Sequence, residues 1–160
     1  MVRKYLRLLY RYFVKKSNID KSVRIDNKKN IVIDASARLL HNVYIQNNFG
    51  LFKLGAHSHL GAFCFVNVHN GECIIGDHTS IGPGTKIIVF SNDYHKDKLN
   101  TELTLCKDIH IGSNVFIGAN CVILPGSIIP DNVVIGAVVK GELQSGYVYG
   151  GVPARVIKVI

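Results

Sequence analysis

The sequence has no run of about 18 uncharged apolar residues, no cysteines spaced as CxxC, and no acidic residue in its first sixteen positions. The first absence argues against a membrane-spanning helix. The second leaves a zinc or thioredoxin-like motif without support, because the cysteines lie far apart, at Cys64, Cys73, Cys106 and Cys121. No small-residue cleavage site of a secretory leader is present, and charges interrupt the first apolar stretch. We therefore expect a cytoplasmic protein with free, mostly buried thiols.

Positive charge is concentrated at one end of the chain. The 160 residues include 19 Lys+Arg and 11 Asp+Glu, for a formal net charge of +8. Six of the positive residues lie within residues 1–16, so only +2 remains for the rest. A basic charge spread over the whole surface would suggest a nucleic-acid partner, and this uneven distribution argues against one. With 48% apolar and 19% charged residues, the chain has the composition of one folded domain.

Aliphatic residues recur every six positions along most of the chain. A small residue often follows the aliphatic one, and a small or β-branched residue lies four positions after it. A period of six fits neither a helix nor a simple alternating strand. It fits a solenoid in which a short strand and a tight turn alternate, with three such sides in each coil and one aliphatic side chain pointing inward from each. An ordinary β-sandwich is the alternative that this strict register disfavours. The series are Ile111–Ile117–Ile123–Ile129–Ile135, Ile75–Ile81–Ile87, Leu54–Leu60–Val66, Ile33–Leu39–Ile45–Leu51 and Ile19–Ile25–Ile31.

The repeat is interrupted at two places. Its phase slips by three between Val66 and Ile75, which predicts a bulge or widened corner over residues 67–72. Residues 91–108 are polar and lack the repeat, yet Ile87 and Ile111 are four periods apart. We therefore expect a loop extruded from one corner while the solenoid continues in phase. Loops on rigid scaffolds are common places for functional residues.

The repeat (Leu/Ile/Val)-(Gly/small)-x-x-(small)-x resembles the hexapeptide repeat of left-handed parallel β-helix proteins over about residues 19–140. With IGSNVFIGANCVILPG (111–126) and GGVPARVIKVI (150–160), the chain resembles bacterial hexapeptide acetyltransferases of the galactoside, maltose and xenobiotic type, and polysaccharide O-acetyltransferases. The resemblance implies an all-β fold: a left-handed β-helix over residues 18–140, with the loop 91–108 extruded, and a C-terminal tail at 141–160. It also implies acetyl transfer from acetyl-CoA to a sugar hydroxyl without a metal, and a homotrimer with active sites between neighbouring solenoids.

The same resemblance implies a binding site for CoA near the last coils. Small residues there leave backbone amides accessible, and nearby cations suit the phosphates. Between Ala137 and Gly151 the chain is about two residues shorter than the galactoside-type pattern, so the residue that faces the adenine end stays open. The predicted CoA-binding residues are Gly118, Ala119, Ala137, Lys140, Arg155 and Lys158, with Gly136 as a further small residue of this region.

The family keeps a histidine in or just before the extruded loop as the base that activates the acceptor hydroxyl. Imidazole suits this role. The candidates are His69, His95 and His110, with His78 on a regular coil, and we choose His95, which lies in the loop beside Asp93 and Asp97. An ungapped comparison instead puts Asn92 at the position of the histidine in galactoside-type enzymes. We predict that the acceptor is held by polar residues of the widened corner and the loop: Asn67, His69, Asn70, Asn92 and Asp93.

Other functions remain open on the sequence alone. A γ-carbonic-anhydrase-like protein needs three histidines on zinc; His59 and His95 are 36 residues apart, but no histidine occurs near Asn100. A catalytically silent solenoid that serves in assembly is a second alternative. Within the enzymes, the acceptor could also be serine, a xenobiotic antibiotic or a sugar amine.

Residues 1–17 are predicted to form a basic amphipathic helix. Arg3, Arg7, Arg11 and Lys15 recur at intervals of four on one stripe, while apolar residues occupy another face. Such a helix can lie on the anionic inner face of a membrane, where lipid-linked glycan precursors are made. It can equally cap the open end of the solenoid.

Overall fold

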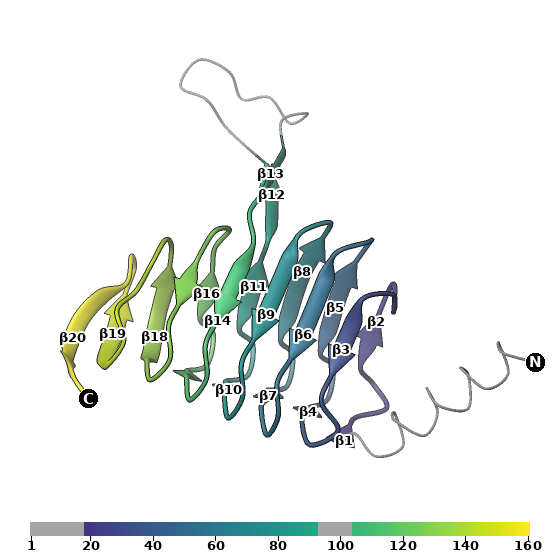
Figure 1. Ribbon diagram of the computed structural model, residues 1–160, viewed down its shortest axis with the longest axis horizontal. Helices are drawn as coiled ribbons and strands as arrows, with labels where there is room; N and C mark the ends of the chain where they lie inside the picture. Colours follow the sequence, from purple (N-terminus) through teal and green to yellow (C-terminus); the bar gives the residue numbers. More distant parts are fainter. Residues whose placement is uncertain (1–17, 93–103) are drawn as a thin grey trace, which may run out of the picture.

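All regular secondary structure in the described part of the chain is β-strand (Figure 1). The computed structural model describes residues 18–92 and 104–160. The predicted helix at 1–17 and the loop residues 93–103 lie outside the described residues. None of the described residues forms a helix long and apolar enough to span a membrane.

The strands stack in parallel on three faces, which we call A, B and C. The coils are numbered by their face-A strands, so that the first begins with β1 and the second with β4. Face A contains β1 (Asn18–Ile19), β4 (Arg38–Leu39), β7 (His59–Leu60), β10 (Ser80–Ile81), β15 (Phe116–Ile117), the start of β18 (Val134–Val139) and β19 (Tyr147–Gly151). Face B contains β2 (Arg24–Ile25), β5 (Tyr44–Asn47), β8 (Phe65–His69), β11 (Lys86–Ile88), β16 (Val122–Ile123) and the end of β18. Face C contains β3 (Ile31–Ile33), β6 (Leu51–Leu54), β9 (Glu72–Ile75), β14 (Ile109–Ile111) and β17 (Ile128–Ile129).

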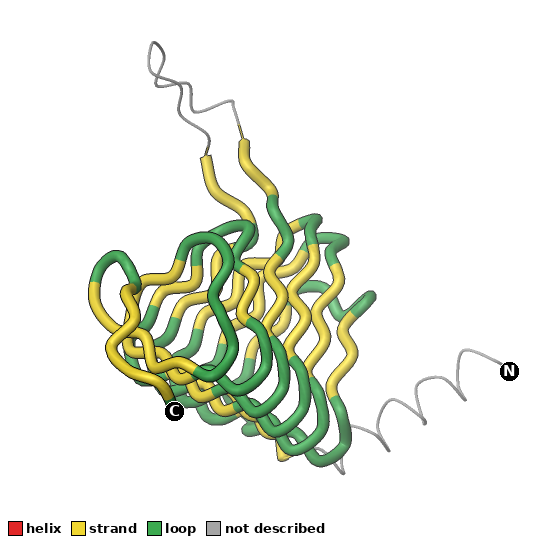
Figure 2. Tube along the Cα trace, turned by 60° about the vertical axis from the view of Figure 1, so that its left-hand side comes forward, coloured by secondary structure: helices red, strands yellow, loops and turns green. Residues whose placement is uncertain are grey.

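The predicted solenoid core is confirmed. Ile81, Ile117 and Ile135 stack in register on face A, and all three side chains are buried. Asparagine and histidine residues with positive φ form several of the tight corners, such as Asn114, Asn120 and Asn132. Figure 2 shows the resulting stack of coils around a narrow core. Each coil therefore buries the aliphatic side chains of its neighbours.

In the predicted series of inward-pointing residues Ile33–Leu39–Ile45–Leu51, the last residue is wrong. Leu54, not Leu51, pairs with Ile33 and Ile75 on face C, while Leu51 pairs with Glu72. The reason is that the phase slip predicted at 67–72 also occurs one coil earlier. In the first three coils the corner between faces B and C is longer than one hexapeptide allows, and Phe52 fills the wider section with no exposed surface. We call residues 26–30, 46–50 and 67–71 the widened corner.

The extruded loop begins and ends in a short antiparallel ribbon. β12 (Phe90–Asn92) pairs with β13 (Thr104–Cys106), and this ribbon stands off the B–C corner (Figures 1 and 2). The sequence predicts no strand here. The ribbon forms because a chain that leaves and returns at one corner places two segments side by side, where their backbone groups can pair.

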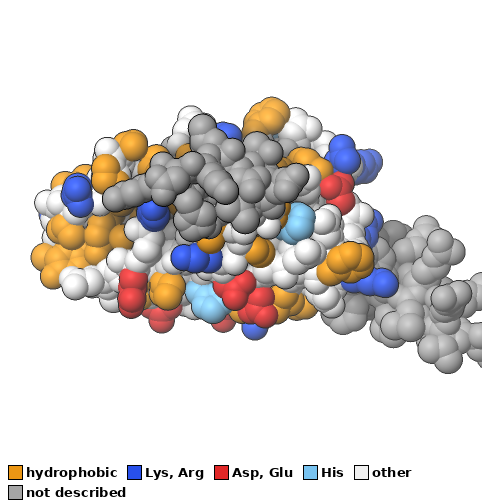
Figure 3. Space-filling view, turned by 90° about the horizontal axis from the view of Figure 1, so that it is seen from above, with side chains coloured by type: hydrophobic (Ala, Val, Ile, Leu, Met, Phe, Trp, Pro, Cys, Tyr) orange, Lys and Arg blue, Asp and Glu red, His pale blue; other side chains and the backbone are white. Residues whose placement is uncertain are grey.

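The sheet continues beyond residue 140. β19 pairs in parallel with β18, and β20 (Arg155–Val159) folds back antiparallel to β19. Tyr149 is buried, so this segment closes the C-terminal end of the core. Hydrophobic side chains gather on the surface of this hairpin (Figure 3); they include Val152, Val156, Ile157, Val159 and Ile160.

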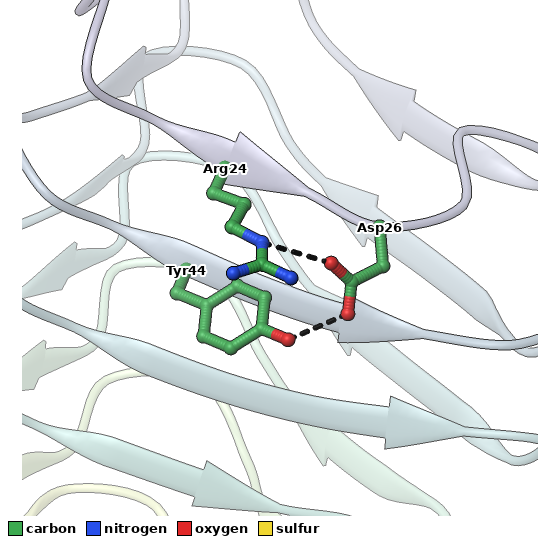
Figure 4. A network of polar contacts seen from close by, with 3 residues as sticks. All are labelled: Arg24, Asp26 and Tyr44. Atoms are coloured by element: carbon green, nitrogen blue, oxygen red, sulfur yellow. Dashed lines mark hydrogen bonds and ion pairs between the residues drawn. The ribbon is translucent and has the colours of Figure 1, made fainter.

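The first two coils are joined on face B by a polar cluster that the sequence did not reveal (Figure 4). Arg24 Nε lies 3.0 Å from Asp26 Oδ1, and Tyr44 donates a hydrogen bond of 2.6 Å to Asp26 Oδ2. The guanidinium of Arg24 also lies over the Tyr44 ring, 4.7 Å from its centroid. The bond to Asp26 raises the pKa of the Tyr44 hydroxyl. Because the cluster is at the surface, it contributes modestly to stability.

Candidate active site

Stacked glycines form a strip without side chains along the corner between faces A and B. We call this strip, formed by Gly61, Gly82, Gly118, Gly136 and Gly150, the glycine track. Neighbouring coils approach closely there: a Cβ on Gly82 would lie 2.6 Å from Ala119 N, and one on Gly61 would lie 2.6 Å from Pro83 N. A Cβ on Gly136, in contrast, would meet nothing within 4 Å. Close stacking of the coils thus requires glycine at Gly61 and Gly82, the position of Gly136 is open, and at Gly150 a Cβ would lie 2.5 Å from Ile157 Cδ1.

The corner between faces C and A has the same glycine spacing, but its backbone amides are occupied. Ala56 N donates to Asp77 Oδ1 at 2.7 Å, and Asp77 N donates to Ser113 Oγ at 3.1 Å. Ser113 N donates in turn to Asp131 Oδ1 at 2.6 Å. At this corner, Asp77, Ser113 and Asp131 each supply a side-chain oxygen that accepts a hydrogen bond from the amide of the coil before.

The A–B corner lacks these side chains. Its residues at the matching positions are Pro83, Ala119 and Ala137, none of which carries a side-chain acceptor. Ala119 is exposed, and its N–H has no hydrogen-bond partner among residues 18–92 and 104–160. An unpaired backbone N–H on a side-chain-free strip can donate to a carbonyl oxygen of a slender ligand. This corner is therefore suited to an extended ligand that contains amide or acyl groups.

The structure places the three predicted phosphate-binding cations at different positions. Arg155 lies opposite Gly150, at the end of the glycine track, whereas Lys158 lies opposite Val148. Lys140 follows the last residue of β18 on face B. All three are exposed. Of the three, Arg155 is the one that the structure brings directly to the track.

The other predicted CoA-binding residues, Gly118, Ala119 and Ala137, all lie at the A–B corner. Ala137 pairs with Gly151 beyond the track, and its side chain is 6% exposed. Small size is therefore required at this position by the neighbouring strand as well as by any ligand.

The predicted acceptor residues gather around the root of the extruded loop. Asn67 and His69 lie on β8, and Asn70 follows in the turn to β9. The Oδ1 atom of Asn67 is buried and has no hydrogen-bond partner in the described structure. Asn92 is exposed at the end of β12, opposite Thr104. Asp93 and His95 lie outside the described residues, so the assignment of the base stays a prediction.

His59, the described histidine of the zinc-dependent alternative, is half-buried on face A. It stacks between Arg38 and Ser80 on the neighbouring strands. Burial, and secondarily the charge of Arg38, lower the pKa of its imidazole. Within residues 18–92 and 104–160, no three His, Cys, Asp or Glu side chains gather closely enough to hold a metal ion.

A model of the bacterial transferase hexapeptide family, which comprises six repeats, matches residues 108–141. The fold agrees with this match: the described strands form the parallel β-helix that the repeat of the sequence predicts for a hexapeptide-repeat protein. Its relatives and structural neighbours are acetyl- and acyltransferases, and the chain is an acyltransferase of this class.

Two curated relatives carry this comparison. Galactoside O-acetyltransferase of Escherichia coli K12 is 29% identical over 143 residues, which cover 85% of this chain and 70% of the relative. WbbJ of the same organism, described as a lipopolysaccharide biosynthesis O-acetyl transferase, is 48% identical over 50 residues, which cover 30% of this chain and 26% of WbbJ.

One solved structure has a closely similar fold. It is a mutant of AntD, an N-acyltransferase from Bacillus cereus, in complex with dTDP-4-amino-4,6-dideoxyglucose and coenzyme A. It superposes with a TM-score of 0.81 and 25% identity, and the match covers 88% of this chain and 79% of AntD.

Proposed function

We propose that the chain transfers an acetyl group from acetyl-CoA to a sugar hydroxyl in the biosynthesis of a surface polysaccharide or lipopolysaccharide. The observation that carries this proposal is the A–B corner, where Ala119 is exposed and its N–H has no partner among the described residues, beside the glycine track. The pantetheine arm of CoA is long, thin and rich in amides, which suits such a strip. The galactoside and lipopolysaccharide O-acetyltransferases among the relatives support a sugar acceptor.

The proposed chemistry is direct transfer within a ternary complex. His95 removes the proton of the acceptor hydroxyl as the oxygen attacks the thioester carbonyl carbon. Backbone amides stabilise the resulting oxyanion. The carbon–sulfur bond then breaks, and CoA leaves as a thiol after taking the proton from the imidazolium. Asn67, Asn70, Asn92 and Asp93 hold the acceptor near the loop, and no covalent acetyl-enzyme forms.

The same geometry supports a homotrimer. Within one chain the loop leaves from the B–C corner, whereas the glycine track follows the A–B corner, so face B separates the two. A site that contains both is completed if the loop of one copy reaches the track of the next. Sedimentation velocity tests this: a monomer at working concentration would contradict the shared site.

An amino sugar is the second candidate acceptor. AntD, which has a closely similar fold, is an N-acyltransferase whose complex contains an amino sugar nucleotide. N-acylation uses the same donor and differs in the nucleophile, since a neutral amine needs less help from a base than a hydroxyl does.

Thiol release from acetyl-CoA tests these proposals on a panel of neutral sugars, nucleotide sugars, amino sugars and serine. We expect turnover with a hydroxyl acceptor, and loss of turnover in His95→Ala. If His95→Ala stays active while Asn92→Ala is inactive, the assignment of the base is wrong. Turnover with amino sugars alone would favour N-acylation, and CoA binding without turnover on any acceptor would favour a silent solenoid.

Residues 1–16 are proposed to bring the enzyme to the inner face of the membrane. Flotation of the full chain with anionic vesicles, beside a variant that lacks residues 1–16, tests this. Equal partitioning of the two proteins would contradict a membrane role and favour a cap on the solenoid end.

A further inference from the structure

His69 is held in place at both its backbone and its ring. Its carbonyl oxygen accepts hydrogen bonds from three successive amides of the previous coil, those of Asn48, Phe49 and Gly50, at 3.0, 3.1 and 3.0 Å. Its φ of +53° belongs to the left-handed region. Its imidazole stacks face to face on the ring of Phe90, with centroids 3.9 Å apart and planes inclined by 11°. Because Phe90 begins β12, His69 contacts the first strand of the extruded loop.

The returning strand of the loop rests on the same corner. Gly71 faces both ends of the loop: a Cβ there would lie 2.6 Å from Val89 Cγ1, 2.9 Å from Cys106 Sγ and 3.0 Å from Asp108 Oδ1. Asp108 Oδ1 also accepts a hydrogen bond of 2.8 Å from Glu72 N. A larger side chain at Gly71 therefore requires a shift of these side chains at the loop root.

Backbone hydrogen bonds connect these contacts into one layer. Val89 N donates to Asn67 O at 2.9 Å, and Lys107 N donates to Val89 O at 3.0 Å. The outgoing strand is thus bonded to the third coil, and the returning strand is bonded to the outgoing one.

We propose that residues 67–72 form a seat that positions the extruded loop, and that His69 is a positioning residue which acts through its stack on Phe90. Its role is therefore not to hold the acceptor, which is the role that the sequence predicts for it. The effect on catalysis rests on the proposed function, whereas the effect on the loop root does not.

Two substitutions at His69 separate these roles. His69→Ala removes the ring, whereas His69→Phe keeps a stacking ring and removes both nitrogen atoms. Phenylalanine tolerates this backbone conformation in the same protein, since Phe63 has a φ of +60°. An aromatic pair contributes enough that its loss should accelerate local opening by about three- to tenfold.

Hydrogen exchange of the Val89 and Lys107 amides, measured by mass spectrometry on the full chain, reports on the loop root without reference to activity. We expect about three- to tenfold faster exchange in His69→Ala and unchanged exchange in His69→Phe. Gly71→Ala should act like His69→Ala. Gly76→Ala is the matched control, because its Cβ would approach Ser113 Oγ to 2.6 Å at the C–A corner, away from the loop. Unchanged exchange in both His69→Ala and Gly71→Ala would contradict the proposal that residues 67–72 position the extruded loop.

Steady-state kinetics then test the role of His69. If His69 acts by positioning the loop, His69→Ala lowers kcat by about three- to tenfold and leaves the KM for acetyl-CoA unchanged. His69→Phe, which keeps the stacking ring, then has the kcat of the wild type. If His69→Phe is as impaired as His69→Ala although its exchange is normal, His69 contacts the acceptor and the positioning role is wrong. A wild-type chain without transferase activity would refute the proposed function, and the exchange data would still decide whether the seat exists.

Discussion

Replacing Ala119 by proline removes one backbone N–H from the A–B corner, and the structure itself provides a precedent for this change. Pro83 occupies the matching position one coil earlier, since Ile81 and Ile117 are paired. The approach to the preceding glycine is the same in both coils, with 2.6 Å from a Gly61 Cβ to Pro83 N and 2.6 Å from a Gly82 Cβ to Ala119 N. A proline ring at position 119 should therefore be tolerated, because position 119 has the same close approach to the preceding glycine as position 83, where proline already occurs.

The expected loss is that of one neutral hydrogen bond to the ligand. Such a bond contributes about 0.5–1.5 kcal/mol, which corresponds to a roughly 2- to 13-fold weaker affinity for CoA. Thermal stability should not fall, because the N–H of Ala119 makes no hydrogen bond within the described structure, and proline at a compatible position restricts the unfolded chain.

Isothermal titration of Ala119→Pro with CoA, together with a thermal melt, checks this prediction. Undiminished affinity in a variant that melts like the wild type would show that this N–H does not bind the ligand. A large loss of melting temperature would instead show that positions 83 and 119 are not equivalent.

Two further predictions concern stability and thiol reactivity. Ala56→Pro, at the C–A corner, removes an N–H that donates to Asp77. The variant should have a free energy of unfolding in urea about 1.5 kcal/mol lower than the wild type and an unchanged affinity for CoA. Weaker CoA binding would show that both corners contact the ligand. Ellman's reagent at pH 8 should modify one thiol per native chain, that of the exposed Cys106, because the other three cysteines are buried; rapid reaction of two or more would contradict this burial. Burial raises the pKa of the Cys64 thiol to about 11 and that of Cys73 to about 12. Since unfolded thiols ionise near pH 8.5 (roughly), the unfolded state releases these protons first, and the free energy of unfolding should fall as the pH rises from there toward the folded pKa values.

The sequence predicts the solenoid well where the repeat is strict and less well where coils are longer. From Ile111 to Ile135 each inner residue follows from the spacing, and the structure stacks them as expected. In the second coil, Leu51 and Leu54 are both leucines three residues apart, so apolar character alone does not tell which one points inward. The decision depends on pairing with Ile33 and Ile75 in other coils, which only the assembled register reveals.

The candidate site shows the same division. The small residues Gly118, Ala119 and Ala137 can be recognised from the sequence, because they belong to the repeat and to the family resemblance. The contrast between the paired amides of the C–A corner and the unpaired N–H of Ala119 depends on contacts between residues one coil apart, such as Ala56 and Asp77. A local sequence pattern contains no such information.

The stack of His69 on Phe90 also joins residues far apart in the sequence. The phase slip over residues 67–72 does not predict this contact, because the same widening of the corner occurs in the two preceding coils. The aromatic partner of His69 could not be inferred, because the sequence predicts an extruded loop and contains no signal for which of its residues contact the corner.

The most direct test of the account is titration of CoA into Gly136→Val. A Cβ at Gly136 meets no protein atom within 4 Å, so we expect the variant to fold while its isopropyl group obstructs the glycine track. Ala35→Val, at an exposed position of the C–A corner in the first coil, is the control of matched size. We predict that the wild type and Ala35→Val bind one CoA per chain and that Gly136→Val binds at least tenfold more weakly (~1.4 kcal/mol). Equal affinity in all three proteins would contradict the assignment of the glycine track as the CoA site.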